Sequence, residues 1–118
     1  MPDLDREQYL YLTTRGRSSG RPREIEIWFT HRAGRFYIIA EYDTSHWLRN
    51  LRADSKVQVR VAGQSFSAQA RVLTPEADAE VRTAVQHLSQ AKYGWSEGTV
   101  VELTPDPETE NKSAKSEM

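Results

Sequence analysis

The sequence has 118 residues and a mass of 13.5 kDa, the size of one small domain. Its formal net charge of −1 argues against a protein that wraps a long nucleic acid. It contains no cysteine, which excludes disulfides, thiolate nucleophiles and cysteine-ligated metals. No apolar run is long enough to span a membrane, and the acidic first residues do not resemble a signal peptide, so we expect a cytoplasmic protein.

The first part of the chain alternates strand-forming runs with turn residues. Residues 9–14 are rich in strand formers, and residues 15–22 hold the glycines, serines and proline that are typical of a turn. Residues 23–31 alternate apolar and polar side chains. They are predicted to form one strand and to pair as a hairpin with residues 35–41, across the turn at Ala33-Gly34.

The rest of the chain adds two helices and three strands. A short helix is predicted over residues 46–52, with Thr44 or Ser45 as its cap, and strands are predicted over residues 57–61 and 65–73. Thr74 and Pro75 are typical of the start of a second helix, and residues 99–103 form the last strand. Six strands and two helices predict a mainly β (α+β) fold, either a small barrel or a strongly curved antiparallel sheet.

The segment from residue 15 to residue 23 is the first candidate site, because it carries four arginines and no acid: Arg15, Arg17, Arg21 and Arg23. Glycine and serine leave backbone N–H groups free in such a loop, and guanidinium groups add permanent positive charge. The loop can therefore hold a phosphate or a carboxylate. Its spacing is that of neither a P-loop nor G-x-G-x-x-G. A solvated basic turn and a site for single-stranded nucleic acid remain alternatives.

Trp47, with His46 and Asn50 beside it, is the second candidate. A tryptophan on a short helix can wall a pocket for a planar ring, or it can close one end of the core. The histidines lack metal-ligand spacing, and no catalytic triad or paired carboxylates stand out. An anion-binding loop without catalytic machinery suits chemistry that belongs to a bound cofactor.

Residues 12–29, LTTRGRSSGRPREIEIWF, resemble the signature of the flavin/deazaflavin oxidoreductases, which is approximately T-T-x-G-R-x-S-G-x-P-R before an alternating strand. Residues 45–54, SHWLRNLRAD, resemble the W-x-x-N-L-x-A-[NDP] element of the same family. These split β-barrel proteins include the deazaflavin-dependent nitroreductases and are related to pyridoxamine phosphate oxidases. The resemblance covers residues 10–73 in order.

The resemblance implies a six-stranded antiparallel split β-barrel, expected here over residues 1–104, in a homodimer with the cofactor near the dimer interface. Residues 105–118 are expected to form a disordered polar tail. The implied cofactor is the deazaflavin coenzyme F-420, with FMN as the alternative, and no metal is expected. The positions expected to bind the cofactor are Arg17, Ser18, Ser19, Gly20, Arg23, Ile39, Ala40, Trp47 and Asn50.

The family reaction is hydride transfer from the reduced cofactor to a small electrophilic acceptor, such as a quinone, an enone or a nitro compound. We therefore expect a deazaflavin-dependent reductase, with Tyr42 as the candidate proton donor. The alternatives are an FMN-dependent split-barrel oxidoreductase and a carrier of a flavin or tetrapyrrole that has no catalytic activity. We expect no nucleic-acid partner and no membrane span.

Overall fold

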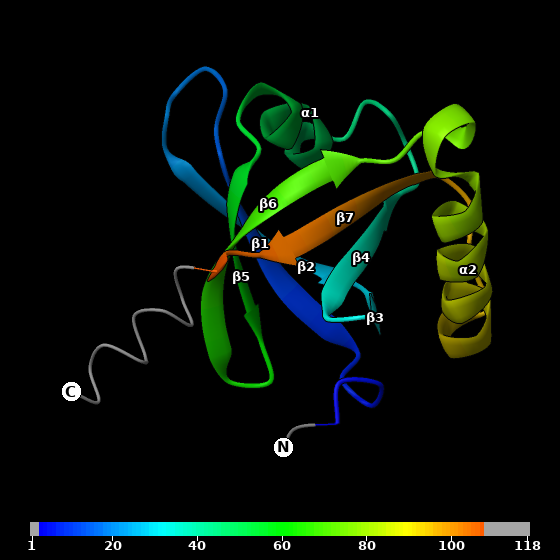
Figure 1. Ribbon diagram of the computed structural model, residues 1–118. Helices are drawn as coiled ribbons and strands as arrows, with labels where there is room; N and C mark the ends of the chain where they lie inside the picture. The colour runs from blue at the N-terminus through cyan, green and yellow to red at the C-terminus, as the bar shows by residue number, and fades with distance from the viewer. Residues whose placement is uncertain (1–2, 108–118) are drawn as a thin grey trace.

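The structure is a computed structural model that describes residues 3–107 (Figure 1). Its elements, in chain order, are β1 (Tyr9–Arg15), β2 (Pro22–Trp28), β3 (Thr30–Arg32), β4 (Arg35–Ala40), α1 (His46–Ala53), β5 (Lys56–Val61), β6 (Gln64–Val72), α2 (Pro75–Tyr93) and β7 (Thr99–Pro105). The strands form one sheet in the order β2-β1-β5-β6-β7-β4-β3, and every neighbouring pair is antiparallel. The expected mainly β fold with two helices is confirmed, with seven strands in place of six.

The additional strand arises at Phe29. The alternation over residues 23–31 predicted one strand, but β2 pairs with β1 and β3 pairs with β4. Phe29 lies between them and is buried; its N–H donates to the Tyr93 hydroxyl (3.1 Å), and its carbonyl accepts from the Lys92 ammonium (3.1 Å). Side chains from the end of α2 thus replace ladder hydrogen bonds where the chain leaves one edge of the sheet for the other.

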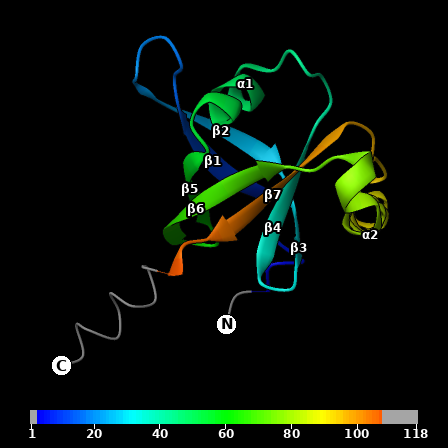
Figure 2. The same cartoon turned by 45° about the horizontal axis from the view of Figure 1, so that its top comes forward.

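β2 and β3 are the two outer strands of the sheet, and only Phe29 separates them along the chain. The sheet therefore curls until its edges approach each other at this corner. Leu48 and Leu51 of α1 join the buried cluster on the inner surface of the curl, and α1 covers one end of it (Figure 2). Other members of this cluster are Leu10, Leu12, Ile38, Val57, Val59, Val101 and Leu103.

The outer surface of the curl is covered by α2, which lies beside β4 and β7 in Figure 1. Because side chains alternate along a strand, β4 serves both surfaces. Ile38 and Ala40 belong to the inner cluster, whereas Tyr37 and Ile39 pack with Val85 of α2. The end of β4 therefore lies between the inner cluster and the cluster that packs against α2.

The helix ends partly follow the sequence prediction. The Thr74 hydroxyl accepts a hydrogen bond from the Ala77 N–H (3.2 Å) at the start of α2, as a capping residue does. Gly94, which follows the last residue of α2, adopts the left-handed conformation with φ 75° and caps the helix. Ser45 precedes α1, but its side chain makes no capping hydrogen bond. No helix within residues 3–107 is long and apolar enough to cross a membrane.

β7 extends through Pro105, into the segment that was expected to be a disordered tail. The N–H of Asp106 then donates to the Ser67 carbonyl (2.9 Å), and Asp106 is buried. The ordered part of the chain thus reaches slightly beyond residue 104. The rest of the predicted tail, residues 108–118, lies outside the described residues.

Candidate functional site

Two cavities lie on either side of Trp47, and both are lined by β2. The loop cavity is lined by residues 14, 16–19, 22–25, 46, 47 and 50 and has a volume of about 770 Å³. The aromatic cavity is lined by residues 9, 26–28, 39–42, 45, 47 and 95 and has a volume of about 560 Å³. His46, Trp47 and Asn50 line the loop cavity, so both predicted candidate sites lie there, and Trp47 also lines the aromatic cavity. The two neighbouring cavities are together called the groove.

β2 forms a shared wall of this groove. Arg23 and Ile25 line the loop cavity, and Ile27 lines the aromatic cavity. Alternate residues of a strand point to the same side, and four residues of strand span about 13 Å. The groove therefore changes along β2 from a cationic end to an apolar end, which suits a ligand that joins an anionic group to a planar ring.

The loop cavity contains hydrogen-bond donors that no other part of the described chain uses. The Arg23 guanidinium, the N–H groups of Ser18 and Ser19, and the Ser18 hydroxyl make no hydrogen bond or ion pair within residues 3–107. Glu24, the carboxylate at this cavity, pairs with Arg60 (3.3 Å). A permanent cation, two N–H groups and a hydroxyl form a donor set that fits a phosphate.

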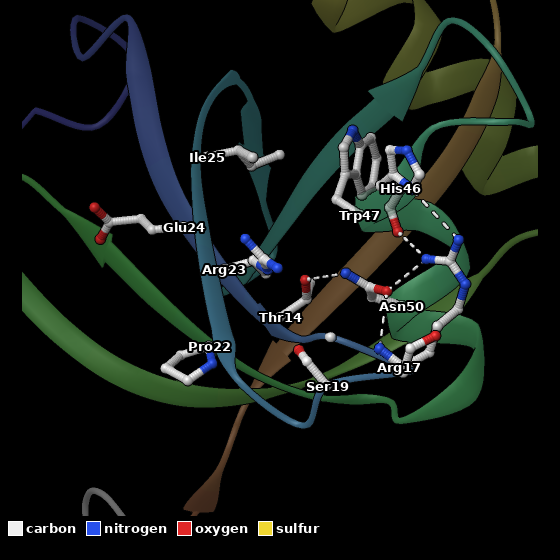
Figure 3. Close-up of a pocket in the computed structure, with 12 residues that line it drawn as sticks. Thr14, Arg17, Ser19, Pro22, Arg23, Glu24, Ile25, His46, Trp47 and Asn50 are labelled. Atoms are coloured by element: carbon white, nitrogen blue, oxygen red, sulfur yellow. Dashed lines mark hydrogen bonds between the residues drawn. The ribbon is translucent and has the colours of Figure 1, made fainter.

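Arg17 is held against α1 (Figure 3). Its Nη1 donates to the Asn50 Oδ1 (2.7 Å), its Nη2 lies 3.3 Å from the His46 Nδ1, and its backbone N–H also donates to the Asn50 Oδ1 (3.2 Å). Asn50 is buried, and its Nδ2 donates to the Thr14 hydroxyl (3.2 Å). Arg17 and Asn50 thus fasten the loop to α1 and β1, whereas no dashed line reaches Arg23 in the same view.

Gly20 lines neither cavity. Its N–H donates to the Gly16 carbonyl (2.8 Å), and its φ of 73° closes the turn. The Ser19 hydroxyl, which lines the loop cavity, accepts from the Arg21 N–H (3.1 Å). Gly20 therefore shapes the loop, while the donors of Ser18, Ser19 and Arg23 remain available to a ligand.

Ile39, Ala40 and Tyr42 meet at the aromatic cavity. Ile39 and Ala40 are buried at its floor, and Tyr42 stands at its mouth with 64% of its surface exposed. The end of β4 is fixed by Gly98, because a Cβ atom there would lie 2.2 Å from the Ala40 carbonyl oxygen. The floor of the cavity thus depends on the close approach of two backbone segments.

All three tryptophans of the chain, Trp28, Trp47 and Trp95, line the aromatic cavity. Trp28 stacks on Tyr93, with ring centroids 4.5 Å apart and planes within 6°. The Tyr93 hydroxyl accepts from the Phe29 N–H and lies 2.7 Å from the Gln8 carbonyl oxygen, and burial raises the pKa of this hydroxyl. A protonated Tyr93 therefore fixes the wall that Trp28 forms.

Trp28 and Trp95 were not among the positions expected to bind the cofactor, yet both line the aromatic cavity. Their juxtaposition depends on α2 packing beside β3, which no local pattern reports. Within residues 3–107 there is no group of three or more His, Asp or Glu side chains that could hold a metal ion.

The family model described as F420H(2)-dependent quinone reductase matches residues 3–104. The chain is also similar to solved structures at the level of the fold. One is described as an F420-H2 dependent reductase (FDR-A), with 21% identity, a TM-score of 0.68, and coverage of 81% of this chain and 93% of that one.

Two further structures show how widely this fold is shared. The heme storage protein HutZ from Vibrio cholerae has 19% identity and a TM-score of 0.71, with 86% of this chain and 83% of that chain covered. A structure described as a domain-swapped dimer has 22% identity and a TM-score of 0.66, with 90% and 84% covered. Because proteins with different ligands share the fold, the site has to carry the functional argument.

Proposed function

Because the chain belongs to the family of F420H2-dependent quinone reductases, we propose that its groove holds the coenzyme with the phosphate in the loop cavity and the ring in the aromatic cavity. The chain is an oxidoreductase, and the bound coenzyme supplies the hydride that passes to a small electrophilic acceptor such as a quinone. The observation that carries the placement is the set of unpaired donors around Arg23, at one end of a groove whose other end is aromatic.

In this proposal the residues of the chain bind and orient the coenzyme and keep water away from its ring. Arg23, Ser18 and Ser19 neutralise and hydrogen-bond the phosphate, and Arg17 with Asn50 keeps their loop in place. Trp47 and Ile27 offer apolar walls to the ring, which keeps water away from the reacting centre. Tyr42 remains the candidate proton donor. Tyr42 is exposed and lines the cavity, where water can serve the same role.

The test compares two arginines of the same loop. Arg23→Gln removes the unpaired guanidinium of the loop cavity, whereas Arg21→Gln removes an exposed guanidinium outside it and is the matched control. A hydrogen bond to a charged group contributes about 1.5–3 kcal/mol, so Arg23→Gln is expected to weaken coenzyme binding by about ten- to a hundredfold. Arg21→Gln should change the Kd less than about twofold.

The measurement is a fluorescence titration of each variant with the deazaflavin coenzyme and, in parallel, with FMN. Equal losses in the two variants would mean that only the general charge of the loop matters, and would overturn the assignment of Arg23. Binding of FMN with no binding of the deazaflavin would keep the loop cavity as the phosphate site and would identify FMN as the coenzyme. Arg17→Ala is less informative, since it also breaks the contacts to Asn50.

We also propose that the chain forms a homodimer. The family resemblance implies one, a structure of similar fold is a domain-swapped dimer, and Tyr9 and Trp28 are exposed at the rim of the aromatic cavity. Activity toward nitro compounds and a cytoplasmic location stay predictions.

A further inference from the structure

The aromatic cavity and the loop cavity differ in charge. Among residues 3–107, those that line the aromatic cavity include the carboxylates Glu26 and Glu41 and no lysine, arginine or histidine. The loop cavity is lined by two arginines. Within the described part of the chain, the charged side chains at the end of the groove where the acceptor must approach the ring are therefore all negative.

Glu41 is the carboxylate at this end that remains free to act on a ligand. The Glu26 carboxylate accepts from the Tyr11 hydroxyl (2.7 Å), and the nearby Asp43 accepts from the Thr99 hydroxyl (2.8 Å). The Glu41 side chain is exposed and makes no hydrogen bond or ion pair with any residue from 3 to 107.

The backbone around Glu41 is held in place. Ala40, the preceding residue, is buried and packs against Gly98. On the other side, the Ser45 N–H donates to the Tyr42 carbonyl (3.1 Å) and closes the turn that leads into α1. The carboxylate is therefore presented at the mouth of the cavity from a fixed backbone, and not from a free end.

We propose that Glu41 selects acceptors by charge, so that the protein favours neutral and cationic planar acceptors over those that carry a carboxylate, sulfonate or phosphate. This inference rests on the proposed function, because it takes the aromatic cavity as the route of the acceptor to the ring. It assigns Glu41 a role in specificity and none in hydride transfer.

Two physical effects act in the same direction. An anionic acceptor meets a carboxylate in a cavity without a compensating cation, whereas a cationic one is attracted to it. The faces of the tryptophan rings also favour a cation and disfavour an anion. Since Glu41 is exposed, water and salt weaken the effect. We expect kcat/KM for the cationic acceptor to exceed that for the anionic one by about three- to tenfold, and by less at high ionic strength.

The first test needs no coenzyme. All three tryptophans line this cavity, so their fluorescence reports on what enters it. The probes are two naphthoquinones of equal size, one with a trimethylammonium and one with a sulfonate substituent. The wild type should be quenched at lower concentrations by the cationic probe, and Glu41→Gln should reduce this preference by about threefold or more. Glu80→Gln, which removes an exposed charge on α2, is the matched control and should leave the preference unchanged.

The second test measures kcat/KM for the two charged quinones and for the unsubstituted naphthoquinone with the reduced coenzyme. Glu41→Gln should keep its activity toward the neutral quinone and show a preference for the cationic one that is smaller by about threefold or more. Activity with the neutral quinone and an unaltered charge preference in Glu41→Gln would overturn this inference and leave the proposed function standing. Failure of the wild type to reduce any of the three quinones would overturn both.

Discussion

Asn50 shows how one buried side chain positions the candidate site. Its Oδ1 accepts both from the backbone and from the guanidinium of Arg17, and its Nδ2 donates to Thr14. The family resemblance placed Asn50 among the cofactor-binding positions. The structure gives all of its polar atoms intramolecular partners, so we interpret it as a positioning residue for the loop that carries Ser18 and Arg23.

Replacing Asn50 tests this interpretation. Asn50→Ala leaves the Arg17 N–H and the Thr14 hydroxyl without their partner, and should lower the free energy of unfolding by about 2 kcal/mol. Asn50→Asp keeps an acceptor for both Arg17 donors and should cost less. Urea unfolding measures both values. Equal destabilisation by the two substitutions would show that the acceptor toward Arg17 is not what matters.

The sequence could propose the arginine loop but could not distinguish its arginines. Arg17 and Arg23 occupy equivalent-looking places in a basic turn. Whether an arginine is free depends on a partner that the fold supplies, and Asn50 lies 33 residues beyond Arg17 in the chain. A local pattern therefore predicts the chemistry of a loop better than it predicts which side chain performs it.

Among the helices and strands, the ends that local residues determine were predictable, and the ends that distant residues determine were not. The start of α2 was predictable, because Thr74 and Pro75 carry their own structural signals. The break at Phe29 was not, because the groups that satisfy its backbone, Tyr93 and Lys92, come from the far end of α2. Ile25 and Ile27 are the more buried residues of β2, as the alternation predicted, but the single strand over residues 23–31 was wrong, because alternation alone does not say which neighbour each half pairs with.

Asp78 in the first turn of α2 gives a pH-dependent prediction. Its Oδ2 accepts from the Thr74 N–H (2.9 Å) and its Oδ1 accepts from Arg71 (3.0 Å). The hydrogen bond from Thr74, and then the contact with Arg71, hold the pKa of this carboxyl below its usual value. A lowered pKa in the folded state means that the carboxylate stabilises the fold above the ordinary pKa of about 4, and that this contribution is lost as the pH falls through the lowered value.

The expected result is that Asp78→Asn is less stable than the wild type at pH 7, and that the difference shrinks as the pH is lowered from 5 toward 2. Urea unfolding across this range measures it. Glu80→Gln, the exposed carboxylate control on the same helix, should show no comparable change. A constant difference between Asp78→Asn and the wild type at all pH values would contradict the role of the charge.

For the whole molecule, the curl of the sheet explains why the site lies where it does. The chain joins the two outer strands at Phe29, and β2 then faces the end of β4 and the start of α1. Residues distant in sequence thus meet around Trp47, and the groove gains a cationic end and an acidic, aromatic end. The fold class was predictable from strand periodicity and resemblance, while this polarity appears only once the sheet closes.

The proposed homodimer is tested by comparing two exposed apolar side chains. Tyr9, at the rim of the aromatic cavity, is 38% exposed, and Leu88, on α2 and outside that cavity, is 39% exposed. If the rim is the interface, the wild type should sediment at about 27 kDa, twice the chain mass of 13.5 kDa. Tyr9→Glu would then bury a charge between the two copies and should shift the mass toward that of a single chain, because an unpaired charge is costly to bury. Leu88→Glu should leave the dimer intact. A single-chain mass for the wild type at all concentrations would contradict the homodimer, and dissociation by Leu88→Glu alone would move the interface to α2.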